Sequence, residues 1–185
     1  MRSSDLQREE NYTEYLRLLQ DEDYLDVTYD NESGGVSAVH RLHKFDKQVG
    51  PFGCRRGDYE IRVVSVLRTN GFRVLLESEE SPFYTKNNDG LLNDSPMDIK
   101  TIESTGVWSI STKLRESEKQ GANVVVLYFP DPTLYSNERV LDGISKYENN
   151  PQIQAKKTIT ECIVIVGDRI VGCLKKTTTP SAEWF

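Results

Sequence analysis

Two nearly continuous apolar runs constrain the fold of this chain more than any other feature of its sequence. They occupy residues 124–129 (VVVLYF) and 160–166 (TECIVIV). A strand of this composition is apolar on both faces and has to be covered on both sides. We therefore expect an α/β fold in which helices pack on the two faces of a central sheet.

Periodicity and turn residues predict the remaining elements. Helices are expected at residues 1–24, at 59–69 with Asp58 as the N-cap, from 109 or 111 to 120, and at 138–147. Strands are expected at residues 72–76, 91–92, 97–102 and 169–175, with an exposed loop at 78–90. This order predicts a mixed central sheet flanked by helices, in the α/β (α+β) class.

Residues 1–30 differ in charge from the rest of the chain. They hold nine acidic and three basic residues, which accounts for the whole net charge of −6. Residues 26–35 contain Asn, Ser and paired Gly and predict a linker. We expect an acidic N-terminal helical arm at 1–30 and a single α/β domain at 31–185. The acidic total argues against a protein that coats nucleic acid, but the balanced body can dock on a phosphate backbone.

Several classes of protein lack support in the sequence. No apolar run reaches the roughly 18 residues that a membrane span needs, so no membrane partner is expected. The first ten residues lack the apolar core of a secretion signal. No phosphate-cradling glycine loop, nucleophile elbow or HExxH motif occurs, which argues against an ATPase, a triad hydrolase or a zinc protease.

Asp98-Ile99-Lys100 is the pattern that points to chemistry. Residues i and i+2 of a strand share a face, so Asp98 and Lys100 project together. A carboxylate beside an ammonium can hold a divalent metal and orient a water next to a phosphate. Asp89 lies on the preceding strand of a hairpin, and Glu60 lies on the helix upstream. An ordinary surface ion pair is the alternative interpretation.

These residues stand in stretches that resemble a known family. The stretches are GDYEIRVVSVLRTNGFRVLLESE, NDGLLNDSPMDIK, STKLRESEKQGANVVVLYF and ECIVIVGDRIV. Residues 34–176 resemble the nuclease domains at the C-termini of contact-dependent inhibition toxins and of some phage head-morphogenesis proteins. Such domains form a metal-dependent PD-(D/E)xK group and a barnase/EndoU/colicin/RelE-like group that cleaves RNA without metal. Asn88 stands where the first group has proline.

The resemblance implies a nuclease-like αβββαβ core and a toxin-type endonuclease. In the first group, Glu60, Asp89 and Asp98 would bind Mg²⁺ or Mn²⁺, and Lys100 would position or deprotonate the attacking water. Lys113 and Gln120, on the following helix, would contact the substrate. The expected partners are a nucleic acid, tRNA or other RNA or DNA, and an immunity protein. The site of action would be the cytoplasm, reached as part of a toxin or phage particle.

The two histidines suggest the second mechanism. His40 and His43 would share a face if they were helical. Two imidazoles can serve as general base for a ribose 2′-hydroxyl and as general acid for the leaving oxygen, without a metal cofactor. Phosphate contacts would then come from Lys44, Lys100, Thr112 and Lys113. Ordinary solvent-facing histidines are the alternative.

A different class of function also fits the sequence. The chain could be a non-catalytic structural or interaction protein, encoded by a phage or mobile element, that retains a nuclease-like fold. The acidic N-terminal helix and the absence of a basic stripe favour this alternative.

Overall fold

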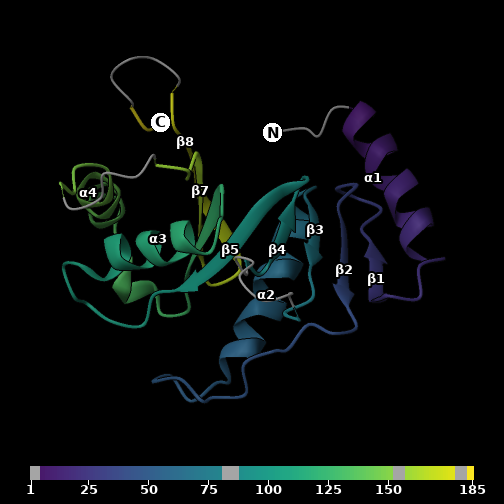
Figure 1. Ribbon diagram of the computed structural model, residues 1–185, viewed down its shortest axis with the longest axis horizontal. Helices are drawn as coiled ribbons and strands as arrows, with labels where there is room; N and C mark the ends of the chain where they lie inside the picture. The colour runs from purple at the N-terminus through teal and green to yellow at the C-terminus, as the bar shows by residue number, and fades with distance from the viewer. Residues whose placement is uncertain (1–4, 81–87, 152–156, 178–182) are drawn as a thin grey trace.

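The computed structural model describes residues 5–80, 88–151, 157–177 and 183–185. Within these ranges, eight strands form one sheet in the spatial order β1 to β8 (Figure 1). The strands are β1 (Tyr24–Tyr29), β2 (Val36–His40), β3 (Arg73–Leu76), β4 (Gly90–Leu92), β5 (Ser95–Thr101), β6 (Val124–Phe129), β7 (Glu161–Val166) and β8 (Arg169–Lys175). The helices are α1 (Asp5–Leu18), α2 (Arg56–Thr69), α3 (Ser109–Lys119) and α4 (Asn137–Glu148), with a 3-10 turn η1 (Pro132–Leu134).

The sheet is mixed, as predicted. β2 pairs with β3 in parallel, and β5, β6 and β7 are parallel to one another. A helix stands between each of these parallel pairs in the chain, namely α2, α3 and α4. The other neighbours are antiparallel. The α/β class is therefore confirmed, and the elements from α2 to β6 follow the order αβββαβ.

The strand β6 shows why helices cover both faces of the sheet. One set of its side chains packs in the core that includes α2, and this set is Val124, Val126 and Tyr128. The alternate set packs with α3 and α4, and this set is Val125, Leu127 and Phe129. α1 lies on the side opposite α2, because Leu18 packs against Leu75, whose neighbours on β3 face α2. Asp98 and Lys100 alternate with Met97 and Ile99 of the α2 core, so they project toward the face that α3 covers.

The N-terminal region departs from the prediction. The linker expected at residues 26–35 is wrong for its first part, because β1 extends to Tyr29 and pairs with β2. β1 is irregular, with Asp26 at a φ of 51° and a register shift between Leu25 and Thr28. This irregularity hides the alternation that predicts a strand. The helix α1 ends at Leu18 rather than at residue 24.

A buried asparagine attaches α1 to the sheet. Asn11 has no exposed surface. Its side-chain amide donates to the carbonyl oxygens of Gly34 at 2.8 Å and Gly71 at 3.2 Å. Arg73, at the start of β3, donates to Asn11 Oδ1 at 3.1 Å. The acidic N-terminal helix is thus fixed to the edge of the sheet through hydrogen bonds as well as apolar contacts.

The start of α2 also differs from the prediction. The helix begins at Arg56, so Asp58 lies in its first turn and is not the N-cap. Carbonyl groups of the preceding loop accept the hydrogen bonds of the first amides instead. Arg56 N donates to Gln48 O at 2.9 Å, and Gly57 N donates to Asp46 O at 2.8 Å. Acceptors supplied by a loop leave no capping signal in the local sequence.

Two further expectations concern the surface. None of the helices in the described part of the chain is long and apolar enough to cross a membrane. Within the exposed loop expected at 78–90, residues 81–87 lie outside the described residues.

Candidate active site

The turn between β4 and β5 sets Asp89 against Asp98. Asn93 and Asp94 form a two-residue turn, and their φ angles of 46° and 69° are the positive values that a type I′ hairpin requires. The pairing register of the two strands, continued by one residue, places Asp89 directly opposite Asp98. Opposed residues of an antiparallel pair have their side chains on the same face. A local turn therefore brings two carboxyl groups together.

Asp98 is a buried carboxylate beside a cation and a second acid. Its exposed fraction is 0%. Lys100 Nζ lies 2.8 Å from Asp98 Oδ2 and donates to Gln120 Oε1, also at 2.8 Å. The ammonium is shared between Gln120 and Asp98, and among the described residues the other polar side chain against Asp98 is Asp89, with which it shares a hydrogen bond. A buried anion in this state is costly to the fold and is typical of a functional site.

Asp89 is the second carboxyl group of the hairpin. Its pKa is raised from 3.8 to about 8, mainly by burial and then by the charge of Asp98, with which it shares a hydrogen bond. Glu60 raises the pKa further. The Ile99 amide donates to Asp89 Oδ2 at 2.6 Å, which fixes the carboxyl group and opposes the shift. Coupled carboxyl groups with displaced pKa values are characteristic of catalytic sites.

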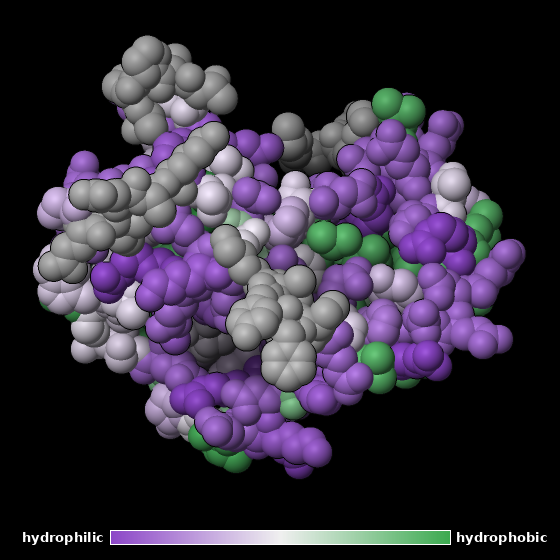
Figure 2. All heavy atoms as spheres, in the orientation of Figure 1, coloured by the Kyte–Doolittle hydropathy of each residue, from purple (hydrophilic) through white to green (hydrophobic). Residues whose placement is uncertain are grey.

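A hollow of about 430 Å³ opens beside this pair. Figure 2 shows a depression below α3 whose rim is largely hydrophilic. Five predicted site residues line the hollow, namely Lys44, Glu60, Asp89, Lys100 and Lys113. They come from the loop before α2, from α2 itself, from the hairpin and from α3. The structure thus brings residues from four separate segments to one opening.

The other predicted substrate contacts are placed differently. Gln120 holds Lys100 from the end of α3. Thr112 does not line the hollow, and its hydroxyl accepts a hydrogen bond from Arg115 at 3.1 Å. Lys44 and Lys113 also pair with Glu80 at 3.4 Å and Glu116 at 3.2 Å. These two pairs are more than one third exposed, so water screens them and both lysines can exchange partners.

The two histidines do not share a helical face, because His40 belongs to the strand β2. The His40 ring packs edge-on against Tyr24 with centroids 5.5 Å apart, and its Nδ1 accepts from Leu42 N at 3.1 Å. The His43 side chain has no exposed surface and lies 3.5 Å from Glu60 Oε1 through Nε2. Burial works against protonation of His43, but Glu60 and the Glu77 carbonyl outweigh it and raise its pKa. Since the His43 side chain is buried, this structure offers no pair of imidazoles to a substrate.

Sequence reasoning missed an ion pair at the rim of the hollow. Arg56 Nε and Nη2 donate to the two oxygens of Glu103 at 3.0 and 2.8 Å. The pair connects the first turn of α2 with the segment after β5, and it raises the pKa of Arg56. Arg56 and Glu103 are 47 residues apart in the chain, so no local pattern indicates it.

The residues fit a divalent cation in part. Carboxylate oxygens are the donors that Mg²⁺ and Mn²⁺ prefer, and Asp89 and Asp98 place theirs side by side. Among residues 5–80, 88–151, 157–177 and 183–185, no three His, Cys, Asp or Glu side chains are grouped to hold a metal ion. The acidic donors that face each other are Asp89 and Asp98, and Glu60 acts on them from α2.

No protein-family model, no curated protein and no solved structure matches this chain.

Proposed function

We propose that the protein is an endonuclease that cleaves phosphodiester bonds at the hollow beside Asp89, Asp98 and Lys100. The observation that carries this proposal is the buried Asp98, which faces a second buried acid, Asp89, shares a hydrogen bond with it and has the Lys100 ammonium beside it. Two acids buried against each other are costly to the fold and are found at catalytic sites. The order of elements from α2 to β6 is the αβββαβ order that the resemblance to toxin nucleases implies.

The residues divide into groups with different chemistry. Mg²⁺ or Mn²⁺, when bound, would activate water and neutralise charge on the phosphate. Asp89 and Asp98 would supply the oxygen ligands, with Glu60 beside them. Lys100 Nζ is held by Gln120 at the hollow, where it can orient the attacking water and stabilise negative charge that develops on the phosphate. Lys44 and Lys113 lie at the same opening, where cations attract a phosphate backbone.

Nucleic acid is the substrate that this site suits, and RNA, including tRNA, is the class we propose first. The test is incubation of the purified protein with tRNA and with plasmid DNA, each with Mg²⁺ or Mn²⁺ and with EDTA. We expect cleavage that EDTA abolishes. Cleavage that persists in EDTA would contradict the carboxylate mechanism, and intact substrates in every metal would contradict the function.

Variants assign the activity to the site. Asp98→Asn and Lys100→Met should abolish cleavage, since each removes one charge without adding bulk. A matched pair on α4 serves as the control, because Asp142 and Lys146 form an ion pair of 2.6 Å away from the hollow. Asp142→Asn and Lys146→Met should cleave as the unaltered protein does. Equal loss in both pairs would place the active site elsewhere.

A second candidate function is binding of a partner protein without catalysis. Exposed apolar side chains on the acidic helix α1 and directly after it favour it, namely Leu6, Tyr12 and Leu16 on the helix and Leu19 behind its end. An immunity protein would be one such partner of a toxin nuclease. Expression in bacteria separates the two functions. The endonuclease should arrest growth and the Asp98→Asn variant should not, whereas a binding protein should leave growth unchanged in both forms.

A further inference from the structure

His43 connects two parts of the candidate site through its two ring nitrogens. Nδ1 lies 2.8 Å from the Glu77 carbonyl oxygen. A carbonyl oxygen only accepts hydrogen bonds, so Nδ1 carries a proton and donates it. Nε2, at the other side of the ring, lies 3.5 Å from Glu60 Oε1. The hydrogen bond to Glu77 therefore decides which nitrogen faces the Glu60 carboxylate.

The imidazole is immobile in this orientation. Its side chain has no exposed surface, and the Phe45 ring stands edge-on to it with centroids 4.9 Å apart and planes at 74°. Nε2 is buried and faces Glu60 Oε1, an acceptor, so it holds this carboxylate by donating a proton of its own. The distance to Glu60 is at the outer limit of a hydrogen bond, and such contacts often shorten when an active site binds its substrate.

The other end of this connection leads to Asp89. The backbone of Glu77 accepts from His43 Nδ1 and donates from its N–H to the Asp89 carbonyl oxygen at 3.0 Å. Tyr24, on β1, donates to Glu77 Oε1 at 2.7 Å and holds Glu77 from the other side. One residue therefore fixes both the backbone of Asp89 and the ring that faces Glu60.

We propose that His43 is a positioning residue, which holds the Glu60 carboxylate in place relative to Asp89. Glu60 belongs to α2 and Asp89 to the β4–β5 hairpin, so secondary structure alone does not set the distance between their carboxyl groups. A glutamate side chain has several rotatable bonds, and contact with a fixed ring restricts them before the substrate binds. The role of Glu60 at the hollow rests on the proposed function, whereas the contact between His43 and Glu60 does not.

Two substitutions separate positioning from a purely structural role. His43→Asn keeps an amide nitrogen near Nδ1 and can still bond to Glu77, but it cannot reach Glu60. His43→Gln places its amide nitrogen near Nε2 and can reach Glu60. We expect His43→Asn to lose about 10-fold to 100-fold in cleavage rate and to need more Mg²⁺ for half-maximal rate, as substitutions behind metal ligands do. His43→Gln should restore a large part of both. A structural role predicts the opposite ranking.

A double-mutant cycle links the effect to Glu60. In a Glu60→Gln background, His43→Asn should cause no further loss, because the residue that it positions has already been changed. His40→Asn is the control. His40 ends the strand β2, and this variant should cleave as the unaltered protein does. Thermal melting of each variant shows whether a loss of rate follows unfolding.

A measurement without activity tests the contact itself. The chain has two histidines, so a His40→Gln variant assigns the imidazole signals in a long-range proton–nitrogen NMR spectrum. We expect His43 to be protonated at Nδ1 and its Nε2 signal to move in Glu60→Gln, while the signals of His40 stay in place. An Nε2 signal that ignores Glu60→Gln, or an Asn variant that cleaves at least as well as the Gln variant, would overturn the proposal. If neither nucleic acid is cleaved, the proposed function fails, and the NMR comparison alone then shows whether His43 contacts Glu60.

Discussion

Two buried acidic side chains, one on helix α3 and one on the strand before it, differ in the groups that surround them. Glu118, on α3, is 8% exposed, and its Oε1 accepts from the Tyr147 hydroxyl at 2.7 Å and from Thr158 N at 3.1 Å. Asp98, on the strand that α3 follows, is 0% exposed, has the Lys100 ammonium beside it and shares a hydrogen bond with a second acid, Asp89. Both groups are removed from water, but only Asp98 has another carboxyl group against it.

The difference separates a structural acid from a functional one. Burial of a carboxylate is tolerated when donors replace the lost water, which is the arrangement at Glu118. Burial, together with the bond to Glu118, raises the pKa of Tyr147, so the hydroxyl stays a donor at all ordinary pH values. At Asp98 and Asp89 two acids face each other, and burial together with the charge of Asp98 raises the pKa of Asp89 to about 8. We infer that the fold keeps this cost because the two carboxyl groups are used.

The comparison is tested most strongly by cleavage. Asp98→Asn or Lys100→Met should lower the cleavage rate on the order of 10²-fold to 10⁴-fold, as removal of a catalytic group does. Glu118→Gln, an equally conservative change of a buried acid, should leave the rate within about 2-fold, since Gln can still accept from Tyr147. Single-turnover cleavage of tRNA measures both. A comparable loss in Glu118→Gln would break the distinction between the two acids.

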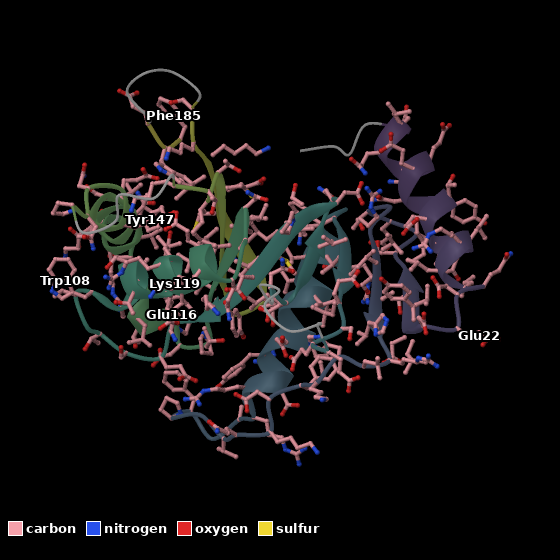
Figure 3. The ribbon with its side chains drawn as sticks, viewed as in Figure 1. Glu22, Trp108, Glu116, Lys119, Tyr147 and Phe185 are labelled. Atoms are coloured by element: carbon pink, nitrogen blue, oxygen red, sulfur yellow. The ribbon has the colours of Figure 1, made fainter. Side chains whose placement is uncertain are left out.

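Stability should respond in the reverse order. Glu118→Ala leaves the Tyr147 hydroxyl and the Thr158 amide without a partner, which should cost about 2–3 kcal/mol in the free energy of unfolding. Urea denaturation measures this cost. Glu116→Ala is the control on the same helix (Figure 3). Its partner Lys113 is 39% exposed, so the change should stay within about 0.5 kcal/mol. Equal costs would show that Glu118 is not a structural acid.

Sequence reasoning reached one of these acids and not the other for a physical reason. Asp98 and Lys100 are two residues apart, so strand periodicity predicts that they share a face, and the hairpin that brings Asp89 to them is also local. Turn residues predict a connection at 93–96 between the two strands, whereas the structure has a two-residue turn at Asn93 and Asp94, which sets Asp89 opposite Asp98. Glu118 depends on donors 29 and 40 residues further along the chain. Nothing in the local sequence distinguishes it from the other charged residues of α3.

The same limit applies to the fold. The apolar strands β6 and β7, whose two faces are both buried, are the elements that composition predicts best. The sequence does not predict β1 and β2. A bulge in β1 breaks its alternation of apolar and polar residues, and β2 is a strand of only five residues that ends at His40. The placement of His43 behind Glu60 depends on the path of the loop from β2 to α2, which no periodicity describes.

A substitution at Gln120 should have a smaller effect on the cleavage rate, and it tests the surroundings of Asp98. Gln120 Oε1 accepts from Lys100 Nζ at 2.8 Å and thereby shares the ammonium with Asp98, whose Oδ2 lies at the same distance. Gln120→Leu should allow Lys100 to turn toward Asp98 and pair with it fully, which would lower the cleavage rate about 10-fold, the usual worth of a hydrogen bond to a charged group. Gln120→Glu, which still accepts from Lys100, is the matched variant and should lose less. Rates that are equal in Gln120→Leu and in the unaltered protein would show that Lys100 needs no alignment.

The pH dependence of stability tests the same cost from the side of Asp89. Asp89 has a pKa of about 8 in the folded chain and 3.8 without its surroundings. Between these values the unfolded chain releases the proton and the folded chain keeps it, so this group makes folding less favourable as pH rises and adds no further change above about pH 8. Asp89→Asn keeps an acceptor for the Ile99 amide but has no proton to release. In EDTA, its midpoint of thermal unfolding should match that of the unaltered protein near pH 4 and exceed it by about 10 °C or more near pH 9, because a difference of about four pKa units corresponds to several kcal/mol. Melting curves at several pH values measure the difference. A difference that does not change with pH would mean that Asp89 ionises as freely in the fold as in water, and the contrast with Glu118 would then rest on Asp98 alone.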